Sequence, residues 1–212
     1  MKVNLIYLKL SYRGLVMPNL KWLPAKISPS DFSNFNEYIN HLYLIFTKYF
    51  FDVNNKIKYD NRNVEISPLM LSERCLILTE KGLTCRNSFT CSNCPFVDKE
   101  DIFNHITCKR LNDETRTPGK YEEERAIRLP WIKPIIENCN EAHPSIKYYE
   151  KILDGELRKY FWLDSEKYIV VLTEGKDNKL YLTTAYYLYN RKCSDRYRKE
   201  YKEYCRKLKK TL

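Results

Sequence analysis

The chain has 212 residues, of which 43% are hydrophobic and 30% are charged, and its net charge is +10. This composition excludes an intrinsically disordered chain, and no apolar run reaches the roughly 18 residues that a membrane-spanning helix needs. The first ten residues lack the pattern of a signal peptide, so we expect a cytoplasmic protein without a membrane partner.

The first third of the chain contains the signals of a strand, a helix and a hairpin. Val3–Leu10 is apolar and predicts a strand. Asn34 and Glu37 have the spacing of a capping box, and apolar residues then recur at helical intervals up to residue 51. The turn-forming residues Asp60–Asn63 separate two short strand candidates, which predicts a hairpin.

The last third of the chain has the most regular pattern. Leu157–Leu163, Tyr168–Thr173 and Leu180–Leu188 are rich in aromatic and β-branched residues, as strands are. The links between them are too short for crossover helices, so the three strands are predicted to form an antiparallel meander. Upstream, Pro130 and Pro134 predict that no continuous helix passes through their part of the chain.

A helix is predicted to follow the meander, over residues 191–210. Its apolar stripe consists of Cys193, Tyr197, Tyr201, Tyr204 and Leu208. The segment from Asn190 to Leu212 also holds ten basic and three acidic residues. Such a concentrated positive charge favours a polyanion, above all nucleic acid, although a solvated terminal helix is the alternative. The residues predicted to bind RNA are Lys159, Arg191, Lys192, Arg196, Arg198 and Lys199.

The eight cysteines are unevenly spaced, and four of them lie between residues 85 and 108. Cys91 and Cys94 form a CxxC pair, with Cys85 upstream and Cys108 downstream. Four thiolates at this spacing suit a structural zinc ion, and His105 could replace one of them in a Cys₃His site. The alternatives are free or buried thiols and a redox pair. We therefore expect zinc as a structural cofactor and no cofactor for catalysis.

The sequence lacks the motifs of the common nucleotide-binding, protease and hydrolase sites. RNA cleavage offers a chemistry that needs no metal, because the 2′-hydroxyl attacks the adjacent phosphate once a base removes its proton. An acid must protonate the leaving oxygen, and cations must stabilise the crowded phosphate. Thr184 and Tyr186 share one face of their predicted strand, as do Arg158 and Tyr160. With 18 tyrosines in the chain, however, such pairs also arise by chance.

Five segments, taken in order, resemble small nuclease-like domains of the barnase–EndoU–colicin–RelE superfamily, particularly the versions carried by phages and mobile elements. The segments are KEDIFNHIT (Lys99–Thr107), RAIRLPWIKPIIEN (Arg125–Asn138), LRKYFWL (Leu157–Leu163), KYIVVL (Lys167–Leu172) and YLTTAYY (Tyr181–Tyr187). A basic helix follows them. The resemblance rests on the order and spacing of these segments.

The resemblance implies an α+β fold with a curved antiparallel sheet packed on helices, and metal-independent cleavage of tRNA or mRNA by a toxin-like enzyme. The residues that it implicates in catalysis are His105, Arg125, Arg128, Arg158, Thr184 and Tyr186. His105 would act as the base or the acid, the arginines would bind phosphate, and the last two residues would form a polar pair on the final strand. If His105 binds zinc, it cannot also accept the proton.

We therefore predict an α+β protein, with an antiparallel β-meander packed on helices as in RelE and barnase, and with a cysteine-rich N-terminal part. Residues 1–95 are expected to form an N-terminal α/β part that includes the cysteine-rich segment. Residues 96–212 are expected to form the nuclease-like sheet with its basic C-terminal helix. The predicted function is endoribonuclease, with RNA and an inhibitor protein as partners. The alternative is a non-enzymatic, zinc-stabilised module that binds nucleic acid or protein, such as a phage inhibitor protein.

Overall fold

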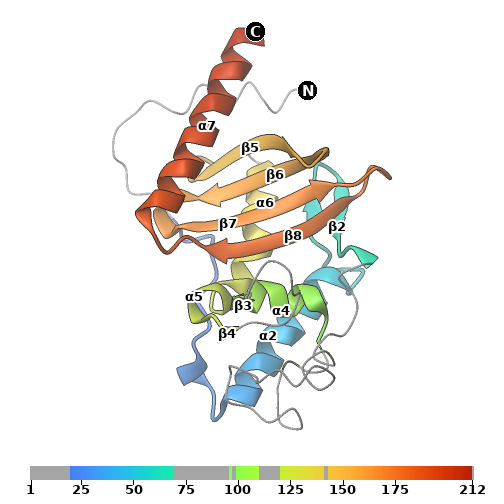
Figure 1. Ribbon diagram of the computed structural model, residues 1–212. Coiled ribbons are helices and arrows are strands. Elements are labelled where there is room, and N and C mark those ends of the chain that lie inside the picture. The colour runs from blue at the N-terminus through green and yellow to red at the C-terminus, as the bar shows by residue number, and fades with distance from the viewer. Residues whose placement is uncertain (1–19, 69–95, 97–98, 110–119, 141–142, 212) are drawn as a thin grey trace, which may run out of the picture. The chain divides into compact units, whose positions relative to one another are not determined.

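The computed structural model describes residues 20–68, 96, 99–109, 120–140 and 143–211 (Figure 1). The chain divides into two compact units, each assembled from several segments. The first unit contains residues 1–24, 57–64 and 131–212, and the second contains residues 25–56 and 65–130. The predicted strand Val3–Leu10 and the predicted boundary after residue 95 lie outside the described residues. Both units take segments from either side of that boundary.

An antiparallel meander forms the centre of the first unit. Its strands are β5 (Ile146–Leu153), β6 (Glu156–Leu163), β7 (Tyr168–Glu174) and β8 (Leu180–Tyr187), each antiparallel to the one before it. A short 3₁₀ turn, η5 (Asp164–Glu166), connects β6 to β7. The three predicted strands are thus confirmed, with β5 added at their N-terminal side.

Strand β5 was not predicted, although the β5–β6 turn has a clear sequence signal. Asp154 and Gly155 both have positive φ, 55° and 79°, as a two-residue hairpin turn requires. Asp-Gly is a strong hairpin signal, but the strand before it lacks a regular alternation, since Tyr148 and Tyr149 are both buried. The fourth meander strand is therefore visible in the sequence only through its turn.

Two shorter strands complete the sheet of the first unit. They are β1 (Lys58–Tyr59) and β2 (Arg62–Glu65), and the sheet order in the described chain is β1-β2-β8-β7-β6-β5. The predicted hairpin is confirmed, but its turn is tighter than expected. Asp60 and Asn61 alone form it, with φ of 52° and 60°, and Arg62 already belongs to the second strand.

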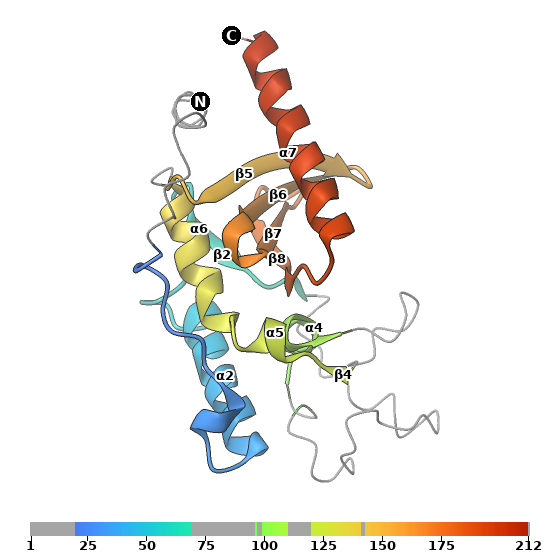
Figure 2. The same ribbon diagram turned by 90° about the vertical axis from the view of Figure 1, so that its left-hand side faces the viewer.

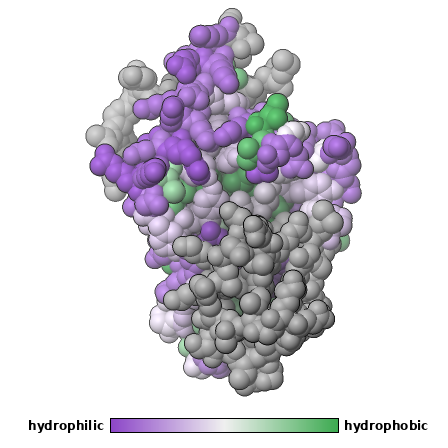
Figure 3. Space-filling model, in the orientation of Figure 1, coloured by the Kyte–Doolittle hydropathy of each residue, from purple (hydrophilic) through white to green (hydrophobic). Residues whose placement is uncertain are grey.

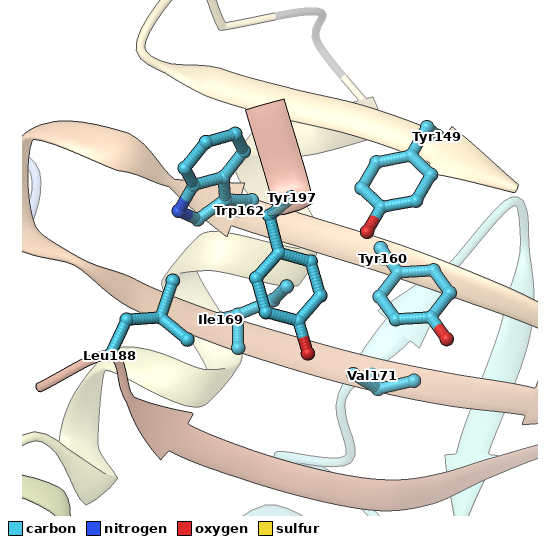
Figure 4. Close-up of a cluster of buried hydrophobic side chains, with 7 residues drawn as sticks. All are labelled: Tyr149, Tyr160, Trp162, Ile169, Val171, Leu188 and Tyr197. Atoms are coloured by element: carbon cyan, nitrogen blue, oxygen red, sulfur yellow. The ribbon is translucent and has the colours of Figure 1, made fainter. Parts of the chain in front are cut away.

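In the described part of the first unit, the sheet carries one helix on each face. Figure 2 shows α6 (Ile132–Asn140) and α7 (Arg191–Thr211) on opposite sides of the meander. Under α7 lies a buried cluster that consists of Tyr149, Tyr160, Trp162, Ile169, Val171, Leu188 and Tyr197 (Figure 4). Tyr197 comes from α7, and Cys193, Tyr201 and Tyr204 of the predicted stripe pack against the cluster. The predicted helix and the role of its apolar stripe are confirmed.

The prediction that Pro130 and Pro134 prevent a continuous helix is confirmed at Pro130 but wrong at Pro134. A 3₁₀ turn, η4 (Leu129–Trp131), contains Pro130, and α6 begins at the next residue. Pro134 therefore lies in the first turn of α6, where a backbone N–H has no partner within the helix. Its missing hydrogen-bond donor costs nothing there, so the helix continues through it.

The second unit is mainly helical in its described part. Its helices are η1 (Pro29–Asp31), α2 (Phe35–Phe50), α4 (Asp101–Thr107) and α5 (Glu123–Ala126), and the strands β3 (Cys108–Lys109) and β4 (Lys120–Tyr121) pair with each other. Asn34 caps α2, because its side chain accepts a hydrogen bond from the Glu37 backbone N–H at 2.9 Å. This confirms the predicted helix and its start. Rings of Phe46 and Phe103 pack edge to face at 5.5 Å in the core of this unit.

The molecule is therefore an α+β protein in which an antiparallel meander packs against helices, as predicted. Among the described residues, no helix is both long enough and apolar enough to cross a bilayer.

Candidate functional site

Helix α7 covers only part of its face of the sheet. Trp162, Ile169 and Leu188 lie beneath it and are almost fully buried. Farther along the same strands, the side chains on this face become polar, because Arg158 and Thr184 take the places of apolar residues. The uncovered part of the face thus differs in chemistry from the covered part.

A groove of about 310 Å³ lies over the uncovered part, next to α7. Its lining residues all belong to the first unit and are Lys151, Leu153, Arg158, Tyr160, Val171, Thr183, Thr184, Tyr186, Arg196, Tyr197 and Glu200. The groove brings together three residues predicted to be catalytic, Arg158, Thr184 and Tyr186. It also includes Arg196, which was predicted to bind RNA.

Two cations face each other across the β5–β6 pair at one end of the groove. Lys151 is the register partner of Arg158, so their side chains leave the sheet on the same face. The Arg158 guanidinium contacts the exposed Asp154 carboxylate at 3.3 Å, and its side chain is 23% exposed. An ion pair with one largely solvated partner contributes little to stability, so Arg158 can exchange Asp154 for an anionic ligand at low cost.

A β-bulge places two threonines in the groove. Val171 pairs with Thr184, but Leu172 pairs with Leu182, so Thr183 is an extra residue in β8. The extra residue lets both threonines line the groove, where simple alternation would turn one of them away. The Thr183 hydroxyl lies 2.6 Å from that of Thr173 in the neighbouring strand.

Two tyrosines connect the groove to α7. The hydroxyls of Tyr186 and Tyr197 are in direct contact, and the Arg196 guanidinium donates to the Tyr197 hydroxyl at 3.0 Å. Burial raises the pKa of Tyr186 above its usual range, and the neighbouring Tyr197 raises it further. Tyr186 therefore stays protonated at neutral pH, which suits a hydrogen-bond donor and not a base.

Glu200 brings a carboxylate to the groove from α7. It accepts hydrogen bonds from the Tyr149 hydroxyl at 3.1 Å and from the Lys151 ammonium at 3.0 Å. These contacts orient the carboxylate and offset its negative charge at the groove wall.

Lys159 lies on the opposite face of β6 from Arg158. Its ammonium contacts Glu150 at 3.0 Å and Glu174 at 3.1 Å, and its side chain is 7% exposed. Arg62 from β2 also contacts Glu174, at 3.1 Å. Lys159, which was predicted to bind RNA, is thus part of a buried ion-pair network within the protein.

The other cations predicted to bind RNA lie on α7. Arg191, Lys192 and Lys199 are exposed, and Arg191 pairs with Asp195 at 3.7 Å. Arg198 contacts the Asp164 carboxylate at 2.9 Å and that of Asp195 at 2.8 Å, so its charge helps to hold α7 on the sheet. The space-filling view in Figure 3 shows hydrophilic side chains gathered over α7.

The remaining residues predicted to be catalytic belong to the second unit. His105 is half-buried in α4. The Arg125 guanidinium donates to the backbone carbonyls of His105 and Cys108, both at 3.1 Å, and so caps the C-terminal end of that helix. Arg128 is buried, with its guanidinium 2.5 Å from the Glu124 carboxylate. Both arginines therefore have structural contacts within their own unit.

Three of the four predicted zinc ligands, Cys85, Cys91 and Cys94, lie outside the described residues. Cys108 is buried at the start of β3, with its sulfur 3.8 Å from the Thr107 hydroxyl. The described residues contain no group of three or more histidine, cysteine or acidic side chains that could hold a metal ion. Structural zinc at the cysteine-rich segment stays a prediction.

Sequence reasoning missed Lys151, Tyr197 and Glu200 as groove residues. Lys151 lies on β5, which was not predicted, and Tyr197 was predicted only as part of an apolar stripe. Glu200 is one acidic residue in a basic helix, and its position against the sheet depends on the contact with Tyr149. No sequence pattern marks any of these three as a groove residue.

Comparison of the chain with models of protein families, with characterised proteins and with solved structures finds no match. The resemblance to nuclease-like domains therefore stays a prediction from the sequence.

Proposed function

We propose that the protein is a metal-independent endoribonuclease and that its groove binds the phosphate to be cleaved. The observation that supports this most directly is the composition of the groove. It brings Arg158, Thr184, Tyr186 and Arg196 together on one open surface, although they come from three separate elements. Cations and hydroxyl donors around a hollow are what a crowded phosphate requires.

The reaction would proceed by attack of a ribose 2′-oxygen on the adjacent phosphorus, with loss of the 5′-oxygen of the next nucleotide. The products are a 2′,3′-cyclic phosphate and a free 5′-hydroxyl, so no water or metal is consumed. A base accepts the proton of the 2′-hydroxyl, and an acid supplies a proton to the leaving oxygen. In the groove, Arg158 and Arg196 would stabilise the negative charge, and the hydroxyls of Thr184 and Tyr186 would donate hydrogen bonds to phosphate oxygens.

The residues that move the protons are proposed from the sequence alone. The resemblance assigns this role to His105, which belongs to the second unit and is not among the residues that line the groove. Glu200 also brings a carboxylate to the groove, but the Tyr149 hydroxyl and Lys151 already bind it. Tyr186 is unsuited to act as a base, since burial raises its pKa.

The direct test is incubation of the purified chain with total RNA in EDTA, followed by analysis of the fragment ends. We expect fragments with 2′,3′-cyclic phosphate and 5′-hydroxyl ends. The double variant His105→Ala with Tyr186→Phe should lose cleavage but retain RNA binding. Circular dichroism in EDTA provides the control, because chelation would also unfold a zinc-dependent protein. Intact RNA with a folded protein would contradict the proposal.

A second candidate function is a non-enzymatic module that binds nucleic acid or an acidic protein. The exposed lysines and arginines of α7 favour it, because the last turns of this helix extend beyond the sheet (Figure 1). A helix exposed in this way can dock on a polyanion without any reaction. RNA binding by the wild-type chain without cleavage would favour this function over the first.

A further inference from the structure

A second cleft, of about 360 Å³, lies between α7 and the edge strand β5. Its lining residues are Tyr149, Glu150, Lys151, Arg196, Lys199, Glu200, Glu203, Tyr204 and Lys207. Lys151, Arg196 and Glu200 also line the groove. The cleft and the groove are therefore neighbours in the first unit, with these three side chains at the boundary between them.

The cations of the cleft lie along one flank of α7. Lys199 and Lys207 are exposed and lie two helical turns apart, with Glu203 between them at a spacing of four residues. A flexible polyanion can lie along such a row, since lysine ammonium groups on long side chains reach phosphates at varied positions.

Two of the three acidic residues that line the cleft are matched by internal cations. Glu150 is bound by the buried Lys159 ammonium at 3.0 Å, and Glu200 by Lys151 at 3.0 Å. Their negative charges are thus partly offset within the protein. The three cations that α7 contributes to the cleft then outnumber its remaining carboxylate, Glu203.

An aromatic side chain lies on the α7 side of the cleft. Tyr204 is half-buried, and its ring centroid lies 6.4 Å from that of Tyr149 and 6.5 Å from that of Tyr148. These neighbours fix the ring against the sheet while part of it remains accessible. Aromatic rings beside a row of cations are the usual means of binding unpaired nucleotides, whose bases stack on the rings.

We propose that this cleft is a second subsite, which holds the nucleotides of a single-stranded RNA next to the phosphate in the groove. This inference rests on the proposed function, because the groove supplies the adjacent phosphate site. Double-stranded RNA would not fit the role, since its bases are stacked inside the helix and cannot reach Tyr204. The preferred substrate is therefore an unpaired strand that extends beyond the cleaved bond.

The test compares a dinucleotide and a 12-nucleotide single-stranded RNA as substrates of the full chain. The variant Lys199→Gln with Lys207→Gln removes two charges from the cleft. The control, Lys176→Gln with Lys179→Gln, removes two exposed charges from the β7–β8 turn. We expect the cleft variant to raise KM for the 12-mer about tenfold, with kcat and dinucleotide cleavage unchanged. The control variant should match the wild type.

A binding measurement separates this inference from the proposed function. Fluorescence anisotropy with a 12-mer that carries 2′-O-methyl sugars at every position reports affinity without cleavage, because no 2′-hydroxyl remains to attack a phosphate. If no RNA is cleaved but the cleft variant binds about tenfold more weakly than the control variant, the subsite stands and the nuclease proposal fails. Equal affinities of the two variants, or equal affinity of the wild type for a 12-base-pair duplex, would overturn the subsite.

Discussion

The covered and open halves of one sheet face show how the same strands serve two purposes. Under α7, Trp162 and Ile169 are fully buried and pack against Tyr197. Farther along, Arg158 and Thr184 line an open groove. Both halves use side chains that point to the same face, so alternation does not distinguish them. The difference is whether α7 lies above, and it separates a region that stabilises the fold from one available to a ligand.

The largest effect is expected from truncation in the covered half. Trp162→Ala removes a fully buried ring and should lower the free energy of unfolding by about 3–5 kcal/mol. Urea unfolding followed by circular dichroism measures it. The control Ile152→Ala removes a side chain that is 72% exposed and should cost less than about 0.5 kcal/mol. Equal costs for the two variants would mean that α7 does not cover this half.

In the open half, the expected loss is in activity and not in stability. Arg158→Ala should slow RNA cleavage about 100-fold, because a guanidinium that stabilises the phosphate is removed. The free energy of unfolding should change by less than about 1 kcal/mol, since the Asp154 partner is exposed. Single-turnover cleavage and urea unfolding give the two values. A large loss of stability with normal cleavage would mean that Arg158 stabilises the fold and does not act on the phosphate.

Lys159 lies on the opposite face of β6 from Arg158, and its removal should affect mainly stability. Lys159→Met leaves Glu150 and Glu174 without their buried partner and should cost about 2 kcal/mol of stability. RNA affinity should fall less than in Arg158→Ala, because Lys159 does not line the groove and acts on the cleft only by offsetting the charge of Glu150. Anisotropy and urea unfolding test both expectations. A loss of RNA affinity as large as that of Arg158→Ala would show that both faces bind the ligand.

The smallest effect concerns the ion pairs at the edge of the covered half. Burial alone would raise the pKa of Asp164, but hydrogen bonds from Lys147 and Arg198 hold it below its usual range. A carboxyl group with a lowered pKa in the folded state stabilises the protein above its unfolded-state pKa of about 3.9. That contribution is lost as the pH falls through the folded-state pKa.

Asp164→Asn should therefore cost about 1 kcal/mol at pH 7 and less at pH 3, because the contribution shrinks as the pH falls below about 3.9 and vanishes below the folded-state pKa. Urea unfolding of wild type and variant at both pH values provides the measurement. A cost that is independent of pH would mean that packing of Asp164, and not its charge, holds the start of α7.

Local patterns in the sequence were sufficient for most of the individual elements. The Asn34 cap, the hairpin at Asp60 and the stripe of Tyr197 were all predicted and are confirmed, because each depends on neighbours close in the chain. The extra residue Thr183 was not predictable, since a bulge depends on how β8 pairs with β7. Lys159 and Arg158 are adjacent cations in the sequence, and only the packed strands show that one is buried.

The sequence by itself determined the class of fold, the order of the meander strands and the two-sided character of the last helix. These follow from side-chain periodicity and turn chemistry, which act over a few residues. Only the tertiary structure decided which part of the sheet α7 covers. The position of α7 in turn determines which side chains form the groove and the cleft. That choice depends on contacts between residues far apart in the chain, such as Tyr149 with Glu200, which no local pattern encodes.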